Sequence, residues 1–239
     1  TVAGAVLIAQ YIGAGEKEDA RSMANQIFAC AMGFAVVCAT LCFLGTPAIV
    51  NWLGADGGTA YYARVYLRVV IWDMPFLYMV NIFSAVHQAQ GDTVRPMFLN
   101  LGGITLNLFL DPFFMIILNL GTAGAALATL LAKAIPAIVA FGLLCRREND
   151  ICLNRKYMRL QKEKLGMILK IGLPTAIGGS TMQLGFLLMS KNVFVYGTEA
   201  MAAYGIGNKV NGLITLPSNA IGSATATIVG QNMGAKQPD

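Results

Sequence analysis

Polar residues recur at helical spacing inside a strongly apolar stretch of the sequence. Residues 106–118 read LNLFLDPFFMIIL and contain Asn107 and Asp111, and Asn100 lies seven residues before Asn107. These intervals place the three side chains on one face of an α-helix. Pro112 has no N–H, so the carbonyl four residues before it loses its usual helical partner. A carboxylate, amides and a released carbonyl all offer oxygen ligands. The pattern therefore predicts a binding site for a proton or a small cation such as Na⁺ at Asp111.

A second helix follows after the short turn NLGTAG and should add to this site. A hairpin centred near residue 120 brings Thr129 level with Asp111 and Lys133 level with Asn107. Thr129 can then add a hydroxyl oxygen. A charge at bilayer depth costs about 2.5–3.5 kcal/mol on insertion scales, and such residues are usually functional. Two interpretations stay open: Asp111 and Lys133 form a structural ion pair, or Asp111 exchanges a proton or cation during a transport cycle.

Asp73 is a second carboxylate in an apolar stretch, VVIWDMPFLYM. It either lines the same cavity as Asp111 or pairs with Arg68 near the outer surface. His87, the one histidine of the sequence, is predicted to be an exposed polar residue at a helix end rather than a proton relay. No other metal site is predicted, because the five cysteines form no C-x-x-C pair and no further ligand joins them.

The composition indicates an integral membrane protein. Of the 239 residues, 56% are hydrophobic and 12% are charged, whereas soluble proteins carry about 25% charged residues. The net charge of +5 does not point to nucleic acid, because the largest group of basic residues falls in one loop between apolar spans. The sequence contains no nucleotide-binding P-loop, H-E-x-x-H or G-x-S-x-G motif, so we expect a protein that is not an enzyme. The chain begins within an apolar helix, and we interpret it as an internal fragment.

The apolar stretches predict an all-α bundle that crosses the membrane repeatedly. A spanning helix needs about 20 mostly apolar residues. We predict a partial span and six full ones at residues 1–13, 25–45, 65–86, 97–118, 122–144, 166–196 and 205–231. The last is the weakest prediction, because Gly, Ser, Thr and Asn are frequent in it. Such residues suit a helix packed closely against other helices.

The connecting loops divide by charge into two sides. One side holds the loops 14–24, 87–96, 145–165 and 232–239, which carry Lys and Arg, and the other holds loops 46–63, 119–121 and 197–204, which carry neither. Basic loops stay in the cytoplasm. We therefore expect a multi-pass plasma-membrane protein with the long basic loop 145–165 in the cytoplasm.

The two ends of the chain resemble each other. Residues 3–14 read AGAVLIAQYIGA and residues 224–235 read ATATIVGQNMGA, with the same Q-x-x-G-A helix exit. Both exits fall on the predicted cytoplasmic side, which indicates a parallel repeat with a pseudo-axis along the membrane normal. We predict an incomplete first lobe at 1–145, a basic connector at 146–165 and the first two helices of a second lobe at 166–239.

Several motifs together resemble the multidrug and toxic compound extrusion (MATE) family. They are the two helix exits AQYIGAGEKEDA and VGQNMGAKQPD, the central motifs G-D-T-x-x-P, L-N-x-x-L-D-P and G-x-x-G-A-A-L-A-T, and the segments LKIGLPTAI and GTEAMAAYGIGNKV. The resemblance implies twelve helices in two six-helix lobes, of which this chain covers the end of the second helix through the eighth. It also implies efflux of cationic or amphipathic compounds in exchange for H⁺ or Na⁺, with no other cofactor.

The resemblance assigns roles to some residues. In the family the cation site of the first lobe uses an Asn and an Asp that match Asn107 and Asp111, and a Thr that matches Thr129. Some members use an acidic residue on the seventh helix, where this sequence has Gln183 instead. We count Lys133, Asp73, Asn100 and Gln183 as candidate cavity-lining residues.

The leading functional hypothesis is a monomeric antiporter for small molecules in the lipid bilayer. The alternatives are a lipid-linked precursor flippase of the same superfamily, for which a more cationic cavity is expected, and a membrane scaffold with no transport cycle.

Overall fold

The computed structural model describes residues 2–52, 57–146, 151–154, 157 and 161–237, and the regular secondary structure of this part of the chain is helical. The helices are α1 (Val2–Gly13), α2 (Lys17–Trp52), α3 (Gly57–Val70), α4 (Met74–Ala89), α5 (Val94–Pro112), α6 (Gly121–Cys145), α7 (Lys162–Phe194) and α8 (Thr198–Gly234). A 3₁₀ turn, η1 (Ile71–Asp73), joins α3 to α4, and a π-helical turn, η2 (Phe113–Ile117), follows α5. The predicted all-α class is confirmed.

Five of the described helical segments are long and apolar enough to cross a membrane: Lys17–Asn51, Ala60–Ala89, Val94–Ile117, Gly121–Cys145 and Lys162–Phe194. Within the described residues, α8 is long but not among these five, as expected from its many small polar residues. Several helices extend beyond the predicted spans. For example, α7 begins at Lys162 and not at residue 166, because a helix continues past the hydrocarbon region into a polar turn. The connector therefore comprises residues 146–161.

Two prolines set the irregular turns next to the membrane aspartates. Pro75 cannot donate to the carbonyl of Ile71, and the N–H of Met74 bonds to that carbonyl in a 3₁₀ pattern instead. Pro112 ends α5, and beyond it the N–H of Leu118 bonds to Phe113 O at 3.1 Å, as in a π-helix. The π-turn is a form of helix that is frequent at functional sites.

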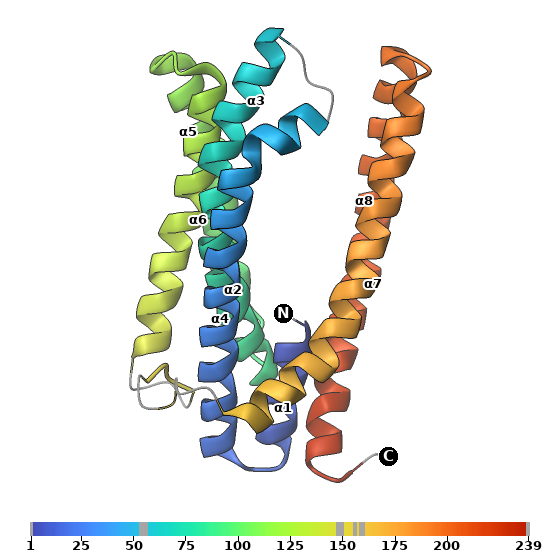
Figure 1. Ribbon diagram of the computed structural model, residues 1–239. Helices are drawn as coiled ribbons and strands as arrows, with labels where there is room; N and C mark the ends of the chain where they lie inside the picture. The colour runs from blue at the N-terminus through green and yellow to red at the C-terminus, as the bar shows by residue number, and fades with distance from the viewer. Residues whose placement is uncertain (1, 53–56, 147–150, 155–156, 158–160, 238–239) are drawn as a thin grey trace.

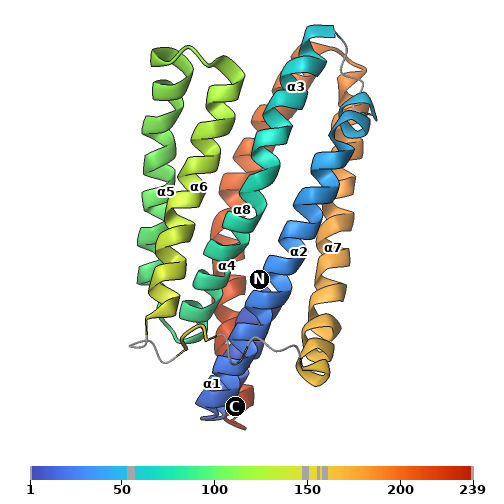
Figure 2. The ribbon, with the colours of Figure 1, turned by 60° about the vertical axis from the view of Figure 1, so that its left-hand side comes forward.

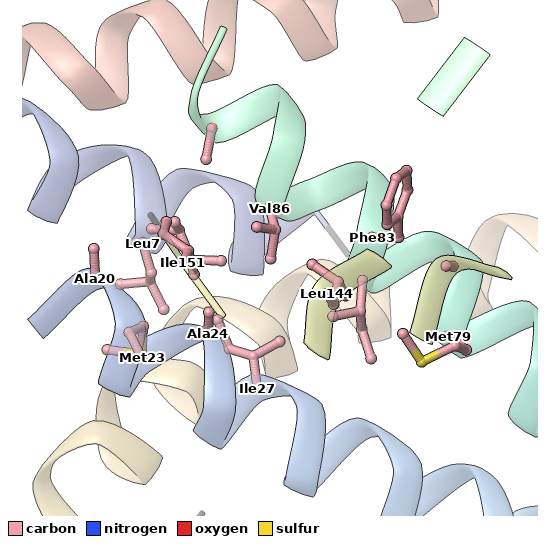
Figure 3. Close-up of a cluster of buried hydrophobic side chains, with 14 of the residues drawn as sticks. Leu7, Ala20, Met23, Ala24, Ile27, Met79, Phe83, Val86, Leu144 and Ile151 are labelled. Atoms are coloured by element: carbon pink, nitrogen blue, oxygen red, sulfur yellow. The ribbon is translucent and has the colours of Figure 1, made fainter. Parts of the chain in front are cut away.

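The hydrophobic core lies between α1, α2, α4 and α6. Its largest buried side chains include Phe83, Met23, Ile8 and Leu144, and Figure 3 shows Leu144 beside Phe83 and Met79 with Ile27 nearby. Many other members are alanines. Small side chains let helix backbones approach closely, which stabilises helix association inside a membrane.

His87 belongs to this buried region and is not the exposed residue that the sequence suggested. Its side chain is 2% exposed, its Nδ1 lies 2.9 Å from Phe83 O, and its ring packs on the ring of Phe83 at 4.0 Å. The position of the residue near the helix end did not reveal this burial.

The two copies of the repeat pack against each other. In Figure 1, α7 and α8 diverge from α2–α6 at the upper end and meet α1 at the lower end, where the chain terminates. Figure 2 shows the same convergence of α1 with the end of α8. Matching residues of the two copies face each other there, because Gly13 contacts Gln231 and Gly234 contacts Gln10. This reciprocity is what a pseudo-two-fold axis produces, and it confirms the parallel repeat.

The connector docks on the lower end of α2. Asn25 Nδ2 donates to Cys152 O at 3.2 Å, and Asn25 Oδ1 accepts from the N–H of Asn154 at 2.8 Å. Gln26 Oε1 accepts from the N–H of Gln161 at 3.2 Å. Asn25 and Gln26 are both fully buried. Two contacts with charged side chains extend this docking: Lys164 with Asp19 at 2.8 Å, and Tyr157 with Glu18 at 3.1 Å. The predicted connector residues Arg147, Arg155, Lys156 and Arg159 lie outside the described residues.

Candidate cation site

The predicted polar face of α5 is present, and two of its residues bond to each other. Asn107 Nδ2 donates to Asp111 Oδ1 at 3.3 Å. Both residues are half-buried. The amide uses one N–H in this bond, so Asn107 Oδ1 and the second carboxylate oxygen stay available as ligands. The helical spacing of four residues is the direct cause of this contact.

Helix α6 packs closely against α5 and η2, because glycines lie at the points of contact. A Cβ built on Gly103 would lie 3.1 Å from Ala132 O, and one built on Gly124 would lie 2.7 Å from Phe114 O. A cavity of about 260 Å³ lies between α4, α5 and α6, and its polar lining consists of Asn100, Asn107, Thr129 and Lys133. The hairpin prediction that Lys133 lies level with Asn107 agrees with this lining. Thr129, which was expected level with Asp111, lines the same cavity, but Asp111 is not among the described lining residues.

Two residues of α6 that line this cavity, Thr129 and Ala132, provide further oxygens. Thr129 Oγ1 donates to Ala125 O at 2.9 Å, which commits its proton and leaves its lone pairs for another partner. The carbonyl of Ala132 cannot receive its usual helical bond, because residue 136 is proline. Sequence reasoning missed Ala132, although Pro136 is the same kind of signal as Pro112.

Lys133 pairs with Asp73 and not with Asp111. Lys133 Nζ bonds to Asp73 Oδ2 across the gap between α6 and η1. The side chain of Asp73 is 8% exposed and that of Lys133 is 37% exposed. Among the described residues, the contact found for Asp111 is Asn107. The interpretation of an Asp111–Lys133 ion pair is therefore wrong.

The remaining predicted residues divide between the cavity and other places. Asn100 lines the cavity, but Asp73 does not, because its carboxylate is buried against Lys133. Among the described residues, the ion pair found for Asp73 is with Lys133 and not with Arg68, whose guanidinium lies 5.9 Å from the ring centre of Phe43. Gln183 lies on an exposed part of α7 and does not line the cavity of the first lobe, because α7 diverges from that lobe.

A second cavity of about 270 Å³ lies between α1, α4, α5 and α8, and Asn100 lines both cavities. Its polar residues are Asn81, Ser84, Gln88, Asn100, Ser223 and Thr227. The sequence analysis did not single out Asn81, Ser84 and Gln88, although their spacing of three and four residues places them on one face of α4. The cavity thus has neutral polar groups from α4, α5 and α8, and α1 lines it with Ala5 and Val6.

The oxygens of Asp111, Asn107, Thr129 and Ala132 have the chemistry of a cation site. Carboxylate, amide, hydroxyl and carbonyl oxygens are ligands for hard cations, and a carboxylate also accepts a proton. The net charge of Asp73, Lys133 and Asp111 is −1 when all three are ionised, so a monovalent cation would neutralise the region.

Comparisons with known proteins agree with this architecture. A family model described as MatE matches residues 1–113 and 174–239. The chain is 31% identical over 242 residues to a probable multidrug resistance protein NorM of Thermotoga maritima, covering 97% of the chain and 51% of that protein. It is 24% identical over 241 residues to the probable multidrug resistance protein YoeA of Bacillus subtilis, covering 98% and 52%. The chain thus spans about half the length of these relatives.

Solved structures share the fold. The chain superimposes with a TM-score of 0.91 on a structure described as a MOP superfamily transporter from Pyrococcus furiosus with a binding pocket of reverse polarity, at 24% identity, covering 99% of the chain and 53% of that structure. A structure described as the outward-facing conformation of a multidrug resistance MATE family transporter gives a TM-score of 0.90 at the same identity and coverage.

Proposed function

Because this chain belongs to the MatE family, we propose that the intact protein is a multidrug efflux antiporter that exports cationic or amphipathic small molecules in exchange for H⁺ or Na⁺. The observation that carries the proposal is the half-buried Asp111, which is hydrogen-bonded to Asn107, whereas the ammonium of Lys133 bonds to Asp73. A carboxylate in a membrane helix without a resident counter-ion is available to an exchanging cation.

Coupling would follow from a difference in cation affinity between two arrangements of the lobes. A ligand shifts a conformational equilibrium only by its differential affinity for the two states. Asn107, Asp111 and Thr129 come from two helices, so a rotation of α5 relative to α6 changes the number of oxygens that reach one ion. Rocking of two repeats about a central site is a known form of alternating access.

The test is Asp111→Asn in the full-length protein, reconstituted in vesicles. We expect gradient-driven efflux of a cationic dye to be abolished, because the amide neither takes a proton nor provides a charge for Na⁺. Glu163→Gln is the matched control, since Glu163 is an exposed carboxylate at the start of α7. Normal efflux by Asp111→Asn, at equal protein content, would overturn the assignment.

The same proposal covers location and partners. The basic turns and the connector lie at one end of the bundle, which supports a plasma-membrane protein with that end in the cytoplasm. We also propose a monomeric working form. The flippase alternative gains less support, because Asp73 neutralises Lys133. Transport of a lipid pyrophosphate in place of cationic dyes would favour it.

A further inference from the structure

The ion pair of Lys133 and Asp73 is a charged unit inside a membrane bundle that the proposed antiport cycle does not explain. Its two ends differ in environment. Asp73 is buried where η1 meets α4, whereas Lys133 also lines the cavity that contains Asn107 and Thr129. The ammonium thus reaches from the cavity wall to a carboxylate behind it.

The charges of this region favour one exchangeable cation. Asp73 and Asp111 are two carboxylates, and Lys133 supplies one ammonium. Other basic groups of the first lobe's outer half have their own contacts, because Arg64 donates to Asn51 Oδ1 at 2.9 Å and Arg68 lies over Phe43. Lys133 compensates Asp73, and Asp111 is the carboxylate with charge left to neutralise.

An ammonium on a lysine is chemically a tethered monovalent cation. If the tether is removed, Asp73 becomes a buried, unpaired carboxylate. Such a group is strongly destabilised and neutralises itself by taking up a counter-ion or a proton. The carboxylate lies directly behind the cavity, so an ion that enters the cavity needs only to replace the ammonium.

We infer that Asp73 is a second cation site that Lys133 keeps permanently occupied, so that Lys133 limits the antiporter to one cation per cycle. This inference rests on the proposed antiport function. Lys133 acts here as a specificity-determining residue for coupling, since it decides how many carboxylates of the first lobe can exchange their cation.

The experiment measures coupling stoichiometry in the full-length protein. Vesicles are clamped at zero membrane potential, and the steady-state dye gradient is recorded against imposed H⁺ or Na⁺ gradients. The slope of the logarithmic plot is the number of cations exchanged per dye. We expect a slope of one for the wild type and two for Lys133→Met. Lys133→Gln keeps a hydrogen-bond donor for Asp73 without the charge, and we expect a slope of two for this variant as well. It replaces Lys133→Met in the test if the Met variant does not fold.

Two matched variants complete the test. Lys133→Arg keeps the cation and should keep a slope of one. The double variant Lys133→Met/Asp73→Asn removes both charges and should restore the slope of one. A merely structural ion pair would change protein yield or melting temperature but not these slopes. A coupled wild type with a slope of one in the Met and Gln variants would overturn this inference alone. A wild type whose dye gradient follows neither cation would overturn the proposed function, and the inference with it.

Discussion

Gly13 of α1 lies in direct backbone contact with Gln231 of α8, so closely that a Cβ built on this glycine would lie 2.7 Å from the carbonyl carbon of Gln231. The relationship is reciprocal, because a Cβ on Gly234 would lie 2.8 Å from the carbonyl carbon of Gln10. Gln231 also donates from Nε2 to Ala89 O at 2.7 Å, which ties α8 to the end of α4. The contact joins the lower ends of α1 and α8.

Gly13→Ala should therefore weaken this contact. The added methyl group overlaps backbone that cannot move aside alone, and overpacking of this kind costs about 1–3 kcal/mol. We expect a lower melting temperature for the purified full-length protein. We also expect a longer distance between spin labels placed near the lower ends of α1 and α8.

Gly33→Ala is the control for this substitution. Gly33 lies inside α2, and a Cβ there would meet nothing within 4 Å. Alanine favours a helix over glycine by about 1 kcal/mol, so this variant should be as stable as the wild type or more so. Equal melting temperatures and label distances for Gly13→Ala and the wild type would contradict the close contact.

Thr129→Val should lower the apparent affinity for the coupling cation. Valine keeps the shape of the side chain but removes the oxygen. An interaction of a hydroxyl with a charged group is worth about 1.5–3 kcal/mol, which corresponds to a roughly 10- to 150-fold change. Thr129→Ser keeps the oxygen and should stay close to the wild type. The measurement is the cation concentration that gives half-maximal dye efflux, and equal values for Val and Ser would exclude Thr129 from the site.

Asn25→Ala should release the connector from α2. The substitution removes both hydrogen bonds to Cys152 and Asn154 from a fully buried position, at an expected cost of about 1–3 kcal/mol. Trypsin should then cleave the basic residues of the connector about tenfold faster. Thr40→Ala serves as the control, because the Thr40 hydroxyl donates only within α2, to Val36 O at 2.8 Å. Unchanged cleavage in Asn25→Ala would show that these bonds do not hold the connector.

His87→Ala should reduce stability without changing transport per folded molecule. The ring of His87 is buried against Phe83, and truncation of a large core side chain costs about 2–5 kcal/mol. The melting temperature should fall. Loss of cation coupling in the folded fraction, in contrast, would indicate that His87 is a relay and not a packing residue.

Much of the site was predictable where one helix determines the geometry. The bond between Asn107 and Asp111 follows from a spacing of four residues. The position of Lys133 beside Asn107 follows from a short turn and the rise of two antiparallel helices. Pro75 and Pro112 predict the irregular turns η1 and η2, because a proline lacks the N–H that forms the usual helical hydrogen bond, whatever its neighbours.

Contacts between helices were not predictable in the same way. The sequence by itself determined that the chain forms membrane helices, that Asp73, Asp111 and Lys133 lie within them, and that its two ends repeat. Only the tertiary structure decided that Lys133 reaches Asp73, that Asn25 binds the connector and that His87 is buried. Periodicity states which residues share a helical face, but the rotation and crossing of the helices decide which faces meet. A long, flexible lysine side chain can then reach either of two carboxylates.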